Sequence, residues 1–168
     1  IDIGAGSFTV AMMADNLNKI GTGGGYILFS TCNTEVYKGI TVYANGSGGN
    51  MGFRFRFAGM NNGFLKITYD ITKHTDWTHL AFTFDRSVAG SVTITAYVNF
   101  KKVGSVTQPV TADETFTYGA SQNFVVGSVN PEAWGDVTTT MTQTNQYNLS
   151  AAGVTIYRGV APIDAVQT

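Results

Sequence analysis

The stretch "WTHLAFTFDRSVAGSVTITAYVNFKKVGS", residues 77–105, decides the fold prediction. In its first arm, Leu80, Phe82 and Phe84 stand at alternate positions, and four apolar residues between 92 and 98 alternate in the same way. Side chains of a β-strand point alternately to its two faces, so each arm predicts a strand with one apolar face. The "DRSVAGS" between the arms is typical of a turn. The stretch therefore predicts an antiparallel hairpin covering a core.

The same two-residue period recurs along the chain. "MGFRFRFAG" places Phe53, Phe55 and Phe57 on one face and Arg54 and Arg56 on the other. Glycine-rich segments such as "GTGGG" and "NGSGGN" separate the strand-like runs, and we find no convincing helical stripe. Further strands are predicted in "SFTVAMMA", "GYILFSTC", "GITVYAN", "FLKITYD", "NFVVGSV" and "GVTIYRG". The pattern predicts an all-β, antiparallel β-sandwich, with residues 1–168 forming a single domain.

Composition excludes several classes of function. The 168 residues carry a net charge of −1 and 12% charged residues, without a long basic run, so we expect no nucleic-acid partner. The apolar runs are far shorter than a bilayer span, so we expect no membrane insertion. Cys32 is the one cysteine, which leaves no internal disulfide, and we interpret it as a buried thiol. The opening "IDIGAGSFTV" suggests a processed chain, an excised domain or part of something longer.

"WTHLAFTFD", followed by a glycine turn and "ITAYVNFKKVGS", resembles the laminin G-like or concanavalin A-like lectin/glucanase superfamily. "SFTVAMMADN", "GGYILFS", "NFVVGSV" and "AGVTIYRGVAPID" are similar to other strands of that superfamily in the expected order. The resemblance implies a jelly-roll sandwich that binds glycans. Two departures are notable. Phe100 stands where the superfamily has a turn glycine, and Ala152 and Gly153 replace an acidic pair before the final strand.

Catalysis is not expected. Glycoside hydrolases need two carboxylates flanking the scissile bond, and the glucanase branch carries them as E-x-D-x-x-E on one strand. The eleven acidic residues here are scattered and do not form that pattern. The two histidines, His74 and His79, lie in "HTDWTH", which is not a convincing metal-ligand spacing. We therefore predict that the chain is not an enzyme.

The segment 129–148, "VNPEAWGDVTTTMTQTNQYN", is the first candidate binding site. Sugar recognition combines an aromatic ring for the C–H face of the sugar with amides or carboxylates for its hydroxyls. The candidate ligand-binding residues in this segment are Trp134, Asn130, Glu132, Asp136, Asn145 and Tyr147, with Gln146 beside them. The alternative is that Trp134 folds back and closes one end of the sandwich.

Other residues are weaker candidates for a binding site. Tyr43 and Asn45 in "YANGSGGN" form a second candidate binding loop, against the alternative of a plain glycine turn. Arg54 and Arg56 are interpreted as a solvated face, and Trp77 as an aromatic at the edge of the core rather than a sugar platform. The resemblance also makes calcium a candidate cofactor, because the ion is frequent in that superfamily. Asp113, Asp136 and Asn148 are conceivable ligands, although no spacing selects them.

Two functions remain open. The first is a non-catalytic carbohydrate-binding, lectin-like module whose partner is a glycan or polysaccharide, within a larger parent protein. The second is a structural or adhesion display domain of an extracellular or virion assembly that makes protein–protein contacts. Both imply an extracellular, cell-surface or virion-surface location. The fold alone does not choose between them, because sandwiches serve many functions.

Overall fold

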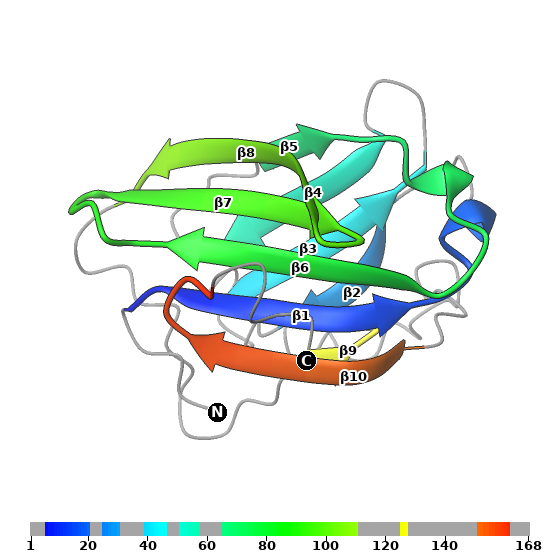
Figure 1. Ribbon diagram of the computed structural model, residues 1–168. Helices are drawn as coiled ribbons and strands as arrows, with labels where there is room; N and C mark the ends of the chain where they lie inside the picture. Colours follow the sequence, from blue (N-terminus) through cyan, green and yellow to red (C-terminus); the bar gives the residue numbers. More distant parts are fainter. Residues whose placement is uncertain are drawn as a thin grey trace, which may run out of the picture.

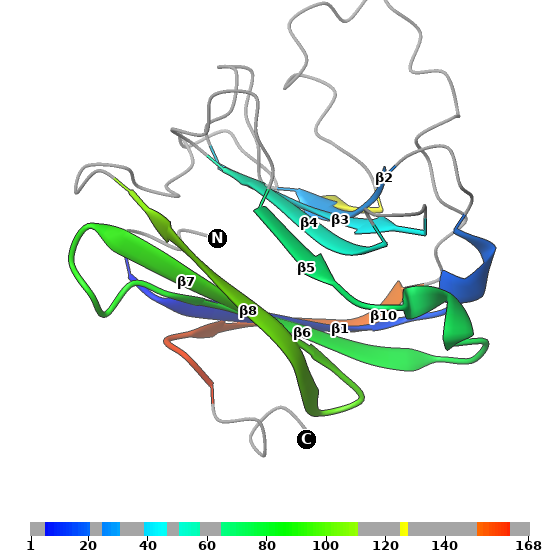
Figure 2. The same cartoon turned by 90° about the horizontal axis from the view of Figure 1, so that it is seen from above.

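The computed structural model shows two five-stranded antiparallel sheets packed face to face (Figures 1 and 2). It describes residues 6–20, 25–30, 39–46, 51–57, 65–110, 125–127 and 151–161, leaving out the side chains of 25, 26, 56, 57 and 125. The strands are β1 (Phe8–Ala14), β2 (Gly25–Ser30), β3 (Ile40–Asn45), β4 (Gly52–Phe57), β5 (Leu65–Thr68), β6 (Thr78–Asp85), β7 (Ser91–Val98), β8 (Lys101–Pro109), β9 (Val125–Val126) and β10 (Ala151–Arg158). Two short 3₁₀ turns, η1 (Leu17–Lys19) and η3 (Ile71–Lys73), accompany them.

Sheet A has the strand order β10-β1-β6-β7-β8, and sheet B the order β5-β4-β3-β2-β9. The predicted hairpin is confirmed: β6 and β7 pair from Leu80↔Val98 to Asp85↔Thr93. This hairpin continues directly into β8, while β1 and β10 reach sheet A from the two ends of the chain. The predicted all-β antiparallel sandwich is therefore the observed fold.

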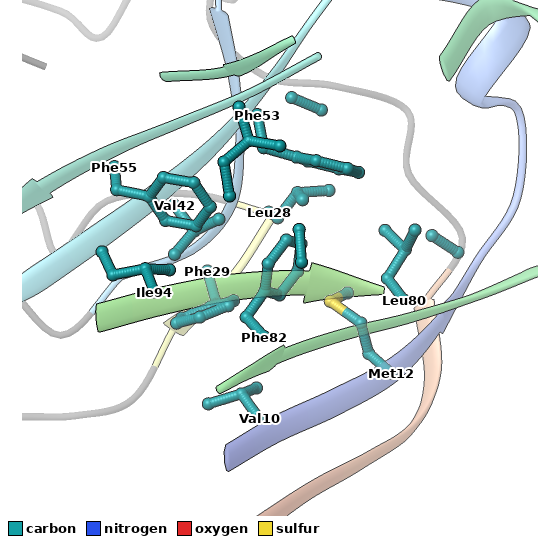
Figure 3. Packing of buried hydrophobic residues seen from close by; sticks show 14 of the residues in the cluster. Val10, Met12, Leu28, Phe29, Val42, Phe53, Phe55, Leu80, Phe82 and Ile94 are labelled. Atoms are coloured by element: carbon teal, nitrogen blue, oxygen red, sulfur yellow. The ribbon is translucent and has the colours of Figure 1, made fainter. Parts of the chain in front are cut away.

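The core lies between the sheets and is dominated by phenylalanine. Phe82 of sheet A contacts Phe53 and Phe55 of sheet B edge to face, with ring centroids 5.0 and 5.7 Å apart (Figure 3). Phe8 and Phe84 stack at 4.4 Å within sheet A. All five rings are at most 1% exposed. Offset and edge-to-face pairs add to the free energy gained by burying the rings, so this cluster joins the two layers.

The predicted parity is confirmed for the described side chains. Phe53 and Phe55 are buried in the core, whereas Arg54 is only half-buried on the opposite face of β4. The side chains of Arg56 and Phe57, and residue Cys32, lie outside the described part of the chain. No helix in the described ranges is long and apolar enough to cross a membrane.

The turn between β7 and β8 holds two residues in the left-handed region. Asn99 has φ 46° and Phe100, at the position where the resemblance places a glycine, has φ 65°. Asn99 tolerates this conformation and its Oδ1 accepts a 3.0 Å hydrogen bond from the backbone N–H of His79. The Phe100 ring stacks on the His79 ring, with centroids 4.2 Å apart. Both side chains thus hold a strained turn against the start of β6.

Replacing Asn99 tests the turn. Asn99→Ala removes the acceptor and the tolerance for positive φ, so we expect the free energy of unfolding to fall by about 2 kcal/mol. Asn99→Gly keeps the tolerance and loses only the hydrogen bond, so its loss should be about 1 kcal/mol. Urea unfolding measures both, and equal losses in the two variants would contradict the contribution of the backbone conformation.

The sandwich closes on one side where β8 of sheet A meets β5 of sheet B. A Cβ placed on Gly104 of β8 would lie 2.4 Å from Cγ2 of Ile67, a branched position with little freedom to move. Ile67 is 4% exposed and belongs to the core. Glycine at 104 therefore permits the close approach of the two sheets.

Gly104→Ala should lower the free energy of unfolding by about 1–3 kcal/mol, because the added methyl overpacks this contact. In an Ile67→Ala background, which lacks Cγ2, the same substitution should cost much less. Thermal and urea unfolding of the four proteins gives the coupling energy. Additive losses would show that the two residues do not compete for one space.

Candidate functional site

The structure describes two of the predicted binding residues. Trp134, Asn130, Glu132, Asp136, Asn145 and Tyr147 lie outside the described residues, as do Gln146 and the conceivable calcium ligands Asp113 and Asn148. Tyr43 and Asn45 lie on β3, on the face of sheet B that points away from the core. The prediction for the segment 129–148 therefore lies outside the described residues, and only Tyr43 and Asn45 have described surroundings.

Tyr43 is buried although it lies on the outer face. It is 8% exposed, packs against Ile27, and has the Arg54 guanidinium carbon 5.8 Å from its ring centroid. Asn45 is 2% exposed. Side chains so covered present little ring or amide surface to a sugar.

Trp77 is the large aromatic residue that the described structure leaves open. It immediately precedes β6 and is 48% exposed, in contrast to the buried rings of β6 itself. Its interpretation as an aromatic at the edge of the core accounts for only half of its surface. We call residues 69–77, the segment that leads from β5 through η3 to this residue, the Trp77 corner.

The η3 turn anchors the Trp77 corner to the core. Ile71 is fully buried, and the Asp70 carboxylate caps the turn by accepting hydrogen bonds from the Thr72 N–H at 3.1 Å and the Thr72 hydroxyl at 2.7 Å. The carbonyl of His74 accepts a 3.1 Å hydrogen bond from the N–H of Asn18 in the η1 turn. These contacts fix the backbone before Trp77. A site on a fixed loop loses little conformational entropy on binding.

The backbone on both sides of Trp77 is held as well. The Thr78 hydroxyl donates a 2.8 Å hydrogen bond to the carbonyl of Asp76, and Thr78 itself is buried. The Asp76 side chain is exposed, with the Thr75 hydroxyl 3.4 Å from one of its oxygens. Trp77 thus follows a short, well-anchored segment, and the residue before it, Asp76, has an exposed side chain.

A second aromatic group lies in the same corner. The Tyr69 hydroxyl and Nε2 of His74 are 2.9 Å apart, and the two rings stack with centroids 5.8 Å apart. The Lys73 ammonium lies 4.5 Å from the centre of the Tyr69 ring, within cation–π range. Lys73 is exposed, while Tyr69 and His74 are half-buried. The corner therefore combines aromatic surface, an ammonium donor and carboxylate acceptors.

Two titratable groups of the corner, Asp70 and His74, have lowered pKa values. Hydrogen bonding from Thr72 lowers the pKa of Asp70, which keeps it ionised. Burial, followed by the charge of Lys73, lowers the pKa of His74, which keeps it neutral. Within the described ranges, no three His, Cys, Asp or Glu side chains gather as a metal-binding group. The chemistry available here is hydrogen bonding and ring stacking.

Sequence patterning identified Trp77 but not its role. The period-two pattern of β6 starts at its first strand residues, and Trp77 stands just outside it. The informative signal was the mostly polar segment "DITKHTD" immediately before it, in which Ile71 is the one apolar residue. Aromatics that follow such polar segments merit consideration as surface residues.

No family model and no curated protein matches the sequence. Among solved structures, the fold is similar to the native heptameric SAP-like pentraxin from Limulus polyphemus. The TM-score is 0.66 at 11% identity, over 98% of this chain and 71% of the pentraxin. It is also similar to a tryptophan-to-alanine mutant of HCR D/C VPI 5995, with a TM-score of 0.53 at 14% identity, over 96% of this chain and 35% of that one. At such identities the likeness shows a related β-sandwich fold.

The two histidines give the fold a measurable pH dependence. Burial lowers the pKa of both His74 and His79 from 6.5. Below about pH 6.5 the unfolded chain binds more protons than the folded one, so stability should fall as the pH drops from about 7 to about 5. The lowered pKa values of Asp70 and Asp85 affect stability in a separate, more acidic pH range, below 3.8.

Melting temperatures across this range measure the effect, and His79→Gln should flatten the curve. His79 is 8% exposed, and no described group offers its Nδ1 a hydrogen bond. A melting temperature that rises on acidification to about pH 5, or a wild-type slope in the variant, would contradict the assignment.

Proposed function

We propose that this chain is a non-catalytic carbohydrate-binding module of an extracellular or surface protein, and that the Trp77 corner contacts the glycan. The observation that carries the proposal is the half-exposed Trp77 on an anchored turn. An indole that is 48% exposed leaves apolar ring surface in contact with water. A sugar ring stacking on it would remove that apolar surface from water.

The polar groups of the corner suit sugar hydroxyls. Asp76 directly precedes Trp77 and keeps an exposed carboxylate, which accepts hydrogen bonds. Lys73 supplies an exposed ammonium as a donor. Hydrogen bonds to charged groups are stronger than neutral ones, and their directionality would select among hydroxyl arrangements. The mixture of one cation with two carboxylates favours a neutral glycan over a strongly anionic one.

The similar fold of the SAP-like pentraxin supports a binding module in general terms. The segment 129–148 stays a second predicted contact, since Trp134 and its polar neighbours meet the same chemical requirements. Catalysis is not part of the proposal, and neither is a bound cation. The larger parent protein and the surface location are likewise proposals that follow from the resemblance.

A glycan array with the purified domain, with and without calcium, tests the proposal. We expect Trp77→Ala to weaken binding to the selected glycan by about tenfold or more, the equivalent of losing about 1.4 kcal/mol of ring contact. Val88→Ala is the matched control, because Val88 is 67% exposed in the β6–β7 turn, at the opposite end of β6 from Trp77. Its affinity should equal that of the wild type.

A Trp134→Ala variant separates the two candidate contacts. Loss of binding in this variant alone would move the site to the segment 129–148 and refute the Trp77 corner as the contact. Binding to no glycan by the folded wild type would refute the carbohydrate function. The structural display function would then be the better hypothesis.

A further inference from the structure

His79 of sheet A is enclosed although one of its ring nitrogens has no hydrogen-bond partner. It is the second residue of β6 and 8% exposed, and no described group offers a hydrogen bond to its buried Nδ1. The ring of Phe100, in the turn between β7 and β8, stacks on the imidazole with centroids 4.2 Å apart. Phe100 therefore forms part of the cover that separates this ring from water.

Protonation makes the enclosure of His79 unfavourable. Both ring nitrogens of an imidazolium are donors, so the charged ring would place an Nδ1–H where no described acceptor lies. Burying an unpaired charged donor is far less favourable than burying the neutral ring, and burial accordingly lowers the pKa of His79. A cation–π contact with Phe100 offsets only part of this loss, because it leaves the N–H without an acceptor. The imidazolium is therefore favoured where water reaches the ring.

The charged residues around His79 do not favour the imidazolium in the closed turn. His79 lies opposite Met13 of β1, and Ala152 of β10 lies opposite Met13 in turn. The charged residues nearest along these strands and the turn are Asp15, Asp76, Lys101 and Lys102. The two carboxylates stand outside the β1–β6 pairing, and that of Asp76 is exposed. The two lysines follow Phe100 directly, are exposed, and have the same charge as an imidazolium.

The β7–β8 turn is the part of this region that can move. His79 belongs to β6, which lies between β1 and β7 in sheet A and is paired on both sides (Figure 1). The turn, in contrast, has Asn99 at φ 46° and Phe100 at φ 65°, a region that non-glycine residues seldom occupy. Two hydrogen bonds hold it to β6: the N–H of Asn99 donates to the carbonyl of His79 at 2.8 Å, and Asn99 Oδ1 accepts from the N–H of His79 at 3.0 Å. Without the ring stack, only these bonds would hold a strained turn closed.

We propose that the β7–β8 turn is a pH-sensitive switch, in which protonation of His79 releases the Phe100 ring and opens the turn. At neutral pH the uncharged imidazole keeps the turn closed. On acidification the imidazolium becomes hydrated once Phe100 moves away, and relief of the two positive φ angles acts in the same direction. The open turn presents the Phe100 ring to solvent beside two lysines, so this end of sheet A has a different surface in mildly acidic conditions. The switch does not depend on glycan binding.

An NMR titration of the folded domain from about pH 7.5 to about pH 5 tests the switch. The imidazole resonances report protonation of His79, and amide exchange, corrected for its intrinsic pH dependence, reports opening of the turn. The amide of Asn99 should lose protection with the same midpoint at which the ring titrates. In the open turn, at its ordinary pKa of 6.5, the ring is about 30-fold more often charged than neutral at pH 5, so protection should fall by up to about 30-fold. Amides in the middle of β6 should keep their protection.

Phe100→Gly separates the cover from the rest of the turn. It removes the stacked ring and supplies the residue that best tolerates positive φ. The pKa of His79 should therefore rise toward its ordinary value, and the protection of the Asn99 amide should no longer depend on pH. His74→Gln, at the other histidine, is the matched control and should leave the titration of His79 unchanged.

The wild-type titration is decisive by itself should Phe100→Gly fail to fold. If His79 titrates while the Asn99 amide keeps its protection, the closed turn accommodates the charge and the switch is refuted. Loss of protection in the middle of β6 at the same pH would assign the change to global unfolding and refute it as well. An unchanged pKa of His79 in a folded Phe100→Gly variant would also overturn it, since Phe100 would then not be the cover.

Discussion

The contact of Phe82 with Phe53 and Phe55 is the interaction on which the rest of the structure depends. It joins the middle strand of sheet A to sheet B, and all three rings are almost fully buried. The alternation that places Phe82 inward also sends His79, Ala81 and Thr83 to the outer face of β6. The Asn99 turn and the Trp77 corner both lie at the start of β6, where Asn99 hydrogen-bonds the backbone of His79 and Trp77 directly precedes the strand.

The architecture was predictable because burial is periodic. Every described phenylalanine in the sequence patterns of β4 and β6 lies where alternation predicts it, and the hairpin has the predicted pairing. The prediction was limited where the two-residue period gives no information about what covers a side chain. Tyr43, for example, is covered although its parity is outward. Of the strand predicted in "NFVVGSV", Val125 and Val126 form β9, and residues 123, 124, 128 and 129 lie outside the described chain.

The candidate site was harder to predict for the same reason. Alternation reports which side of a sheet a residue faces, but not what lies over that side. Tyr43 and Trp77 both stand outside the core pattern, yet one is 8% and the other 48% exposed. The difference depends on contacts between segments distant in sequence, such as the hydrogen bond from Asn18 to His74. The alternation of residues along the sequence carries no information about such contacts.

The pairing of β1 with β10 bears on the order of folding. The hydroxyl of Thr9 donates to the carbonyl of Gly159 and accepts from the N–H of Ala161, contacts that span 150 and 152 residues. The β6–β7–β8 meander, in contrast, is entirely local and needs no distant partner. Closing a long loop costs entropy before its contacts compensate, so the meander can form, and β1 can pair with β6, before β10 adds to β1. During synthesis on the ribosome, β1 is therefore the border strand of sheet A until β10 has emerged, and this interval is when the nascent chain most needs protection from aggregation.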